Sequence, residues 1–359
     1  MSLPTTQTAI AQLVLGGADT LQEVLIPVQK PTGRDILVSV KAVSVNPVDY
    51  MKRSGAFDQK LDEPLVLGYD ASGVVEAVGE DVKLFKKGDE VMYAGAMTRS
   101  GSNAPYQIVD ERIVAAKPKT WSYADSAALP LVGLTAWEAL VDNMGIPVSQ
   151  TENPKSLLVI NGAGGVGTVA LTLASKVLKL KTIIATASRP ETIAWTKKFG
   201  ATHVINHTLP LGPQLTKQGL TFDYVFIYSQ FNLYFFTLSS HPPVCGGSNT
   251  KNIDEIVPLI NPLGKITSIL GPDGPIPLQA GMLKSISFHW TAMFTKALFN
   301  ARPETQGQIL KEIAALADAG VLSSDLVTER HVFNVDNLKK VHAKSESGKA
   351  MGKIVLERA

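Results

Sequence analysis

Six consecutive residues near the middle of the chain have the spacing of a phosphate-binding turn. They read Gly162-Ala163-Gly164-Gly165-Val166-Gly167, the pattern G-x-G-x-x-G. A continuous apolar run, Leu157–Asn161, precedes them, and a helical pattern follows. In this setting the glycines permit a tight turn, close approach of a pyrophosphate and close helix-on-strand packing. The N–H groups at the helix start would bind a dinucleotide, with contacts expected at Gly162, Gly164, Gly165, Val166 and Gly167. A structural turn without ligand is the alternative.

The end of the next strand indicates which dinucleotide is bound. Sites for NAD usually carry Asp or Glu about 20 residues beyond the motif, where the carboxylate bonds the ribose hydroxyls. Here the strand Thr182–Thr186 is followed by Ala187, Ser188 and Arg189, with no carboxylate. Ser188 can donate to a 2′-phosphate and Arg189 can pair with it. The sequence therefore predicts NADPH; the alternative is that Arg189 only caps a solvent-facing turn.

The second half of the chain alternates strand and helix patterns around this motif. Such alternation predicts a parallel sheet with right-handed crossovers. One stretch, Phe231–Ser248, interrupts the rhythm with an aromatic half and a Pro/Gly half, and we expect an added surface loop or an unusual helix there. The predicted elements are the strands Leu157–Ile160, Thr182–Thr186 and Thr202–Ile205, a helix from Val166 and a helix through Trp195.

The first third of the chain is rich in short β patterns. Asp35–Val45, Ser72–Val78 and Asp89–Tyr93 are separated by turn residues, a spacing that predicts a small barrel. The final segment, Gly352–Leu356, is a strand that could return to this barrel. We therefore predict an α/β protein in which residues 1–130 and 320–359 form one domain and residues 131–319 form the dinucleotide-binding domain.

Composition excludes several classes of function. The chain of 359 residues has 34 Lys and Arg against 32 Asp and Glu, so a net charge of +2 provides no field for a nucleic-acid partner. The single cysteine, Cys245, can form neither an internal disulfide nor a four-cysteine zinc lobe. Residues 1–10 lack a signal pattern, and the apolar run Leu157–Leu178 is interrupted by four glycines and Lys176. We expect a cytoplasmic protein without a membrane partner.

The chain resembles the medium-chain dehydrogenase/reductase superfamily on its quinone-reductase side, in the group labelled zinc-type alcohol dehydrogenase-like proteins. That resemblance implies a GroES-like β-barrel catalytic domain, a Rossmann doubly wound parallel-sheet domain and a homodimer formed through a sheet edge. Phe231–Ser248 has no counterpart in the family pattern, which fits an insertion or a gene-model artefact. The resemblance covers nearly the whole chain and is carried by Val45–Asp49, Val66–Gly73, Tyr93–Gly95, Gly101–Gln107, Leu129–Ala136, Asn161–Gly167, Thr186–Thr192 and Gly200–His207.

The resemblance also shows where the chain departs from zinc-dependent members. Those members carry a cysteine ligand at the position of Asn46 and a proton-relay Thr or Ser at the position of Val48. Their Gly-His-Glu signature corresponds to Gly68-Tyr69-Asp70, so the histidine ligand is also replaced. His203 and His207 have ligand-like spacing, but they lie in the third strand and at its exit, near the adenosine end of the cofactor. We therefore expect no catalytic zinc.

A reaction without a metal favours conjugated substrates. Reduction of a simple ketone places negative charge beside the hydride acceptor, where zinc dehydrogenases use the ion. Addition to an enone or a quinone disperses that charge into an enolate or hydroquinone anion, which hydrogen-bond donors can stabilise. The sequence therefore favours an NADPH-dependent reductase of small hydrophobic quinones or α,β-unsaturated carbonyls.

Several side chains acquire roles only through the resemblance. It places Asn46 and Thr135 near the nicotinamide, His207 near the adenosine end, and the turn of Ser268, Ile269 and Leu270 at the carboxamide. Tyr50 is the nearest phenol that could donate a proton; the alternatives are a packing role for Tyr50 and solvent as the proton source. Some relatives have a tyrosine where this chain has Phe57. We expect Asp49 to be a buried structural carboxylate, and the aromatic stretch Phe288, Trp290, Met293 and Phe294 to line a substrate pocket, a dimer contact or the core.

Three other functions stay open from the sequence. A metal-free carbonyl reductase or alcohol dehydrogenase would give an alcohol from a non-conjugated ketone. A trans-acting enoyl reductase would need a surface for a carrier domain, which no sequence pattern locates. A non-enzymatic NADPH-binding protein would bind the cofactor without oxidising it.

Overall fold

Apolar runs such as Leu157–Ile160 and Ile183–Thr186, buried on both faces, form the centre of a six-stranded parallel sheet. In the computed structural model, residues 3–57, 60–227, 249–271 and 278–358 are described. The chain divides into two compact units: unit 1 contains Met1–Leu134 and Met293–Ala359, and unit 2 contains Thr135–Ala292. The expected stretch Phe231–Ser248 lies outside the described residues.

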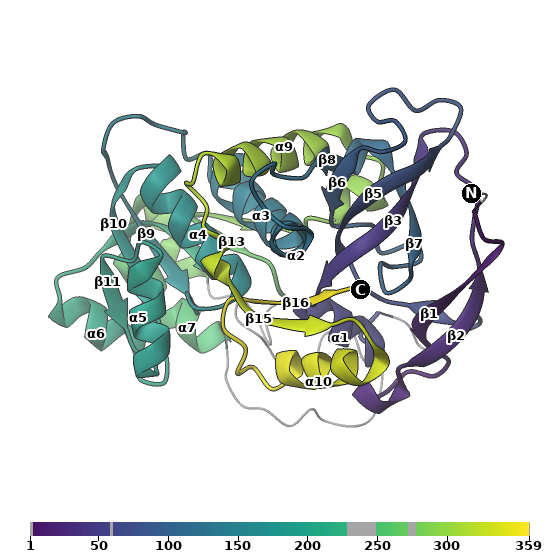
Figure 1. The fold of residues 1–359 in the computed structure, drawn as a ribbon. Coiled ribbons are helices and arrows are strands. Elements are labelled where there is room, and N and C mark those ends of the chain that lie inside the picture. Colours follow the sequence, from purple (N-terminus) through teal and green to yellow (C-terminus); the bar gives the residue numbers. More distant parts are fainter. Residues whose placement is uncertain (1–2, 58–59, 228–248, 272–277, 359) are drawn as a thin grey trace. The chain divides into compact units, whose positions relative to one another are not determined.

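Unit 2 is a doubly wound sheet, as predicted (Figure 1). Its strand order is β11-β10-β9-β12-β13-β14, and every neighbouring pair is parallel. Order reverses between β9 and β12, and in such sheets ligands bind beyond the carboxyl ends of the strands at this reversal. The six strands are β9 (Asn153–Ile160), β10 (Leu180–Thr186), β11 (His203–Ile205), β12 (Phe222–Ile227), β13 (Ile260–Ser268) and β14 (Ser287–Trp290).

Helices connect these strands and cover their faces. Leu211 and Leu215 of α6 and Ile253 and Ile256 of α7 are buried in one cluster with the sheet residues Leu158 and Val225, among others. The connecting helices are α4 (Gly165–Thr172), which continues as a helical turn over Leu173–Val177, α5 (Pro190–Lys198), α6 (Leu211–Lys217) and α7 (Asn249–Ile256). Among the described residues, no helix is both long and apolar enough to span a bilayer.

Unit 1 contains the predicted β-rich region. Its larger sheet has the order β15-β16-β3-β5-β6-β8, with β7 also paired to β3, and a smaller sheet has the order β2-β1-β4. The strand at the end of the chain returns here, because β16 pairs antiparallel with β3. The strands are β1 (Thr6–Gln12), β2 (Gln22–Pro27), β3 (Asp35–Ser44), β4 (Leu65–Val66), β5 (Asp70–Val78), β6 (Glu90–Tyr93), β7 (Tyr106–Asp110), β8 (Val114–Ala116), β15 (Val327–Val332) and β16 (Lys353–Glu357).

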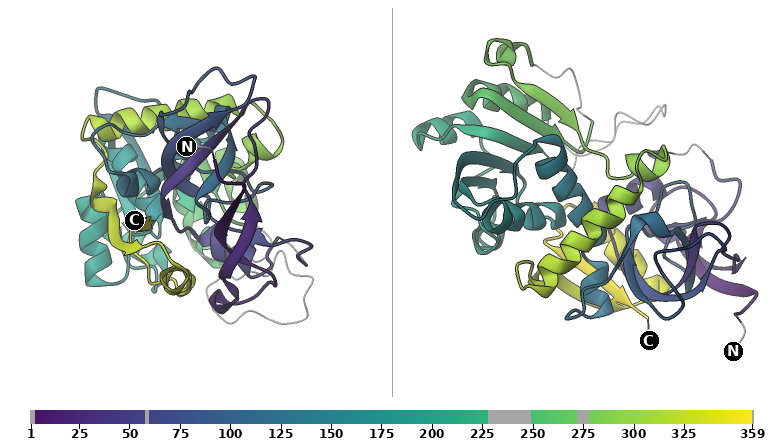
Figure 2. Two further views of the ribbon diagram at one scale, coloured as in Figure 1. Left: turned by 45° about the vertical axis from the view of Figure 1, so that its right-hand side comes forward. Right: turned by 90° about the horizontal axis from the view of Figure 1, so that it is seen from above.

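The chain returns to unit 1 earlier than the expected boundary at residue 320. Helix α9 (Glu304–Asp318) buries Ile309, Leu310 and Ile313, and it belongs to unit 1. At its end, Asp318 accepts hydrogen bonds of 2.9 Å from the backbone N–H and the hydroxyl of Thr120. Both views of Figure 2 show the light-green α9 beside the blue strands of this unit. An amphipathic helix can pack on either sheet, so sequence periodicity alone did not place it.

Unit 1 also contains helices between its strands, one of which crosses into unit 2. The segment around Pro130 forms α2 and α3, followed by a wider helical turn over Glu138–Asn143. These helices are α1 (Pro47–Arg53), α2 (Tyr123–Ala127), α3 (Pro130–Trp137, which crosses the division between the units), α8 (Thr295–Leu298) and α10 (Val335–Glu346).

Candidate functional site

The glycine motif forms the turn between β9 and α4. Asn161 has a φ of 67°, and Gly164 is the N-cap of α4. The first turn of the helix therefore begins at Gly165, and its N–H groups have no partner within the helix. A Cβ on Gly162 would lie 2.9 Å from Cγ2 of Thr196 and 3.0 Å from Cβ of Ala185. The glycine at this position therefore permits the close packing of the turn on its neighbours.

Thr186, at the carboxyl end of β10, connects the predicted parts of the cofactor site. Its hydroxyl oxygen accepts a 2.7 Å hydrogen bond from the Asn161 N–H, and its carbonyl accepts one of 3.0 Å from the Gly162 N–H. The same hydroxyl lies 3.2 Å from Nδ1 of His207. The sequence analysis did not single out Thr186, because a threonine at a strand end carries no distinctive signal.

Ser188 and Arg189 follow β10 at the same edge of the sheet. Arg189 is the N-cap of α5, and its side chain is 42% exposed and forms a 2.8 Å ion pair with Glu191. Burial lowers the pKa of His207, and the positive charge of Arg189 lowers it further. The side chains of Arg189 and His207 are therefore close enough to interact, so His207 lies near the residues predicted to bind a 2′-phosphate.

The turn after β13 supplies the third predicted group. Ile269 donates its backbone N–H to the carbonyl of Ile227 at 3.1 Å, which joins the ends of β12 and β13. Ser268 donates its hydroxyl to the Leu270 carbonyl at 2.9 Å. Thr135 is buried in α3 and belongs to unit 2. Thr135 and the turn after β13 therefore belong to unit 2, whereas Asn46 and Tyr50 belong to unit 1.

The residues at this sheet edge fit a nicotinamide dinucleotide. Backbone donors at the start of α4 suit a diphosphate. Residues 187–189 after β10 include a hydroxyl and a guanidinium and no carboxylate, and the nearby carboxylate of Glu191 pairs with that guanidinium. The fit rests on local geometry around Gly164, Thr186 and Arg189, all within unit 2.

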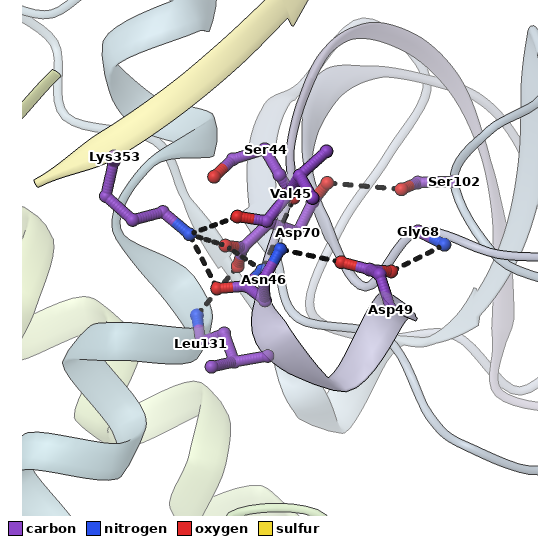
Figure 3. A network of polar contacts seen from close by, with 9 residues as sticks. All are labelled: Ser44, Val45, Asn46, Asp49, Gly68, Asp70, Ser102, Leu131 and Lys353. Atoms are coloured by element: carbon purple, nitrogen blue, oxygen red, sulfur yellow. Dashed lines mark hydrogen bonds and ion pairs between the residues drawn. The ribbon is translucent and has the colours of Figure 1, made fainter. Parts of the chain in front are cut away.

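Asn46 is the N-cap of helix α1 and is 1% exposed. Its amide nitrogen donates to Oδ2 of Asp70 at 2.8 Å and to the Ser44 carbonyl at 3.3 Å. Its amide oxygen accepts a 2.6 Å hydrogen bond from the ammonium of Lys353 (Figure 3). Both amide protons of Asn46 are therefore used within unit 1.

A buried ion pair supports this amide. The side chains of Lys353 and Asp70 are 3% and 0% exposed, and Nζ lies 3.1 Å from Oδ2. The other oxygen of Asp70 accepts a 2.7 Å hydrogen bond from the Leu131 N–H. The sequence analysis missed Lys353, although a lysine directly before the apolar run Ile354–Leu356 is itself a signal of a buried charge that needs a partner.

Asp49 is buried, as expected, and holds two backbone N–H groups. Its oxygens accept hydrogen bonds of 2.7 Å from Asn46 and 3.0 Å from Gly68. Burial raises the pKa of Asp49 to about 7, and the nearby charge of Asp70 adds to the rise. The carboxylate therefore ties the start of α1 to the turn before β5.

The raised pKa of Asp49 predicts a pH-dependent stability. The folded carboxyl keeps its proton to a higher pH than the unfolded one, so the free energy of unfolding falls as pH rises from about 4 to about 7. The slope is at most about 1.4 kcal/mol per pH unit. Urea unfolding at pH 5 to 8 should show this contribution in the wild type and not in Asp49→Asn. Asp81→Asn, at an exposed position, should keep it. Identical slopes in all three proteins would contradict the assignment.

Tyr50 and the predicted aromatic residues differ in exposure and lie in both units. Tyr50 is 7% exposed in α1, and burial, with the charge of Glu346, raises the pKa of its phenol well above the usual range. Phe57 is 38% exposed. Of the predicted aromatic stretch, Phe288 packs edge-on against Trp290 in β14 of unit 2, at 4.7 Å between ring centroids. The other two residues, Met293 and Phe294, belong to unit 1, where Phe294 packs edge-on against Tyr69.

The residues at the zinc-ligand positions do not fit a zinc ion. Asn46 and Tyr69 offer an amide and a phenol, and the amide oxygen of Asn46 already accepts from an ammonium. Zinc sites in proteins use thiolate, imidazole and carboxylate ligands. Within the described ranges, no group of three or more His, Cys, Asp or Glu is arranged to hold a metal.

Comparisons with known proteins agree with this architecture. A family model described as the alcohol dehydrogenase GroES-like domain matches residues 32–119, and one described as zinc-binding dehydrogenase matches residues 199–356. A zinc-type alcohol dehydrogenase-like protein of Staphylococcus aureus strain COL is 38% identical over 329 residues, 91% of each chain. An NADPH-dependent alkenal/one oxidoreductase of Arabidopsis thaliana is 35% identical over 77% of this chain and 75% of that protein. A solved structure of a candidate zinc-dependent alcohol dehydrogenase from Rhizobium etli CFN 42 is 40% identical, with a TM-score of 0.86 over 98% of both chains.

Proposed function

Because the chain belongs to the medium-chain dehydrogenase/reductase superfamily, a superfamily of oxidoreductases, we propose that it is an NADPH-dependent reductase of quinones or α,β-unsaturated carbonyls that works without a metal ion. One observation carries the proposal. At the position where zinc-dependent members have a ligand, the side chain of Asn46 is bonded to Lys353 and Asp70. Without a Lewis acid, substrates that disperse the developing charge are favoured.

The choice of NADPH rests on the end of β10. Ser188 and Arg189 stand where a carboxylate would exclude a 2′-phosphate, and Arg189 is exposed enough to meet a ligand. The similarity to the Arabidopsis thaliana alkenal/one oxidoreductase, whose name specifies NADPH, supports the same choice.

The contributions of the chain are binding, orientation and hydrogen bonding. When bound, the cofactor supplies a hydride from its nicotinamide ring. The start of α4 would hold the diphosphate, and Ile269 and Leu270 would present backbone groups to the carboxamide. Burial raises the pKa of the Tyr50 phenol above its ordinary value, so the phenol is a weaker acid and suits a hydrogen-bond donor better. Solvent then supplies the proton to the reduced product.

The test uses a matched pair of substrates. Oxidation of NADPH should be at least about tenfold faster with 2-cyclohexen-1-one than with cyclohexanone, because only the enone disperses the developing charge. Stabilisation of such charge by one hydrogen-bond donor typically lowers the activation free energy by about 2.7–4 kcal/mol. A quinone such as 1,4-benzoquinone should also be reduced. Dialysis against a chelator should leave both rates unchanged.

Other results of this assay would favour a different function or contradict the proposal. Alcohol formed from cyclohexanone at a comparable rate would indicate a carbonyl reductase. Binding of NADPH without oxidation across the panel would indicate a non-enzymatic role, and loss of activity on chelation would contradict the metal-free reaction.

The same proposal includes a cytoplasmic homodimer. Strand β14 lies at the end of the described sheet order, paired with β13, and Trp290 on it is 51% exposed. An edge strand of this kind can pair with a second copy. Light scattering on the purified protein should give twice the chain mass of 38.4 kDa.

A further inference from the structure

The ammonium of Lys353 is completely coordinated by unit 1. It lies 2.6 Å from Oδ1 of Asn46, 3.1 Å from Oδ2 of Asp70 and 3.3 Å from the Val45 carbonyl. An ammonium has three protons to donate, and these three acceptors use all of them. Lys353 is the first residue of β16, and Figure 3 shows its side chain extending from that strand to the start of α1.

These contacts determine which way the Asn46 amide faces. Its oxygen meets the ammonium, and its nitrogen meets the carboxylate of Asp70 and the Ser44 carbonyl. A flipped amide would place donor against donor and acceptor against acceptor in a buried site, where unpaired polar groups are costly. The Lys353–Asp70 pair therefore permits one orientation only.

The location of the pair links it to the proposed reaction. Asn46 occupies the position of a metal ligand in zinc-dependent members and is the N-cap of α1, the helix that carries Tyr50. We propose that Lys353 is a positioning residue, a cation built into the chain that holds the Asn46 amide and the first turn of α1 in the arrangement that the reductase uses. This inference rests on the proposed function.

A purely structural role for Lys353 makes a different prediction. A buried ion pair can usually be replaced by neutral residues of similar size without loss of stability, whereas removal of one partner leaves an unpaired buried charge. In a purely structural role, only the balance of charge between Lys353 and Asp70 affects stability. In the positioning role, the orientation of the Asn46 amide depends on the ammonium itself. A variant that restores balance without the ammonium separates the two.

The experiment compares Lys353→Met with the double variant Lys353→Met/Asp70→Asn. We expect the single variant to melt roughly 10 °C below the wild type and the double variant to recover most of that loss. We expect kcat to remain at least tenfold reduced in both, with the KM for NADPH changed less than threefold. Lys181→Met removes an exposed lysine whose partner, Glu152, is also exposed, and it should leave melting and kcat unchanged.

Activity that returns together with stability in the double variant would overturn the proposal. If the wild type oxidises no NADPH, the proposed function is refuted, and the positioning role of Lys353 needs a measurement that does not depend on turnover. In protein labelled with 15N-asparagine, the side-chain amide signals of Asn46, assigned with Asn46→Asp, should exchange slowly with solvent. In the double variant they should shift and exchange at least tenfold faster. Unchanged signals would show that Lys353 does not position the amide.

Discussion

Replacing Arg189 with alanine is expected to raise the KM for NADPH about 10- to 100-fold while changing the KM for NADH less than threefold. A hydrogen bond to a charged group contributes about 1.5–3 kcal/mol, and only NADPH carries the 2′-phosphate that Arg189 would bind. Steady-state kinetics with both coenzymes and one enone would measure the two constants.

Two further variants make this test specific. Glu191→Gln removes the carboxylate 2.8 Å from Arg189, so the KM for NADPH should fall while that for NADH does not. Lys181→Ala removes an exposed charge near the other end of β10 and should alter neither constant. If Arg189→Ala weakens both coenzymes equally, the guanidinium does not bind the phosphate, and the preference for NADPH loses its support.

Replacing Gly73 with alanine is expected to destabilise unit 1 by about 3 kcal/mol, the upper end of ordinary overpacking. Gly73 lies in β5 opposite Val40 of β3, beside a register shift between the two strands. A Cβ there would lie 2.2 Å from the Ser39 carbonyl oxygen and 2.8 Å from Cγ1 of Val38. Because the first of these atoms is backbone in a central strand, β3 and β5 would have to separate.

Thermal melting of Gly73→Ala should show a decrease of roughly 10 °C. Gly212→Ala is the matched control, because its Cβ would meet its nearest atom at 3.4 Å, an ordinary contact. Alanine in helix α6 should stabilise by about 0.5–1 kcal/mol. Equal melting temperatures for the two variants would show that the β3–β5 approach is looser than the structure describes.

Local sequence patterns predicted the strand, turn and helix at which we propose that the cofactor binds. The glycine motif follows a strand and opens a helix in the structure, and Ser188 and Arg189 follow the end of β10 as expected. Each of these features lies within a few residues of its strand, so it can be recognised from the spacing of residues in the sequence. Thr186 escaped notice because its three contacts reach the glycine turn and His207, 21 to 25 residues away.

The fold class and the glycine-rich turn before α4 could be predicted from the sequence, since hydrophobic periodicity and glycine spacing act locally. The surroundings of Asn46 depend instead on contacts between residues that are far apart in the chain. Lys353 and Asp70 are 283 positions apart, and pairing of β16 with β3 places the ammonium beside the start of α1. The assignment of α9 to unit 1 was decided in the same way, by packing against strands that are remote in sequence. A buried charge needs a partner, but no local pattern tells which distant residue provides it.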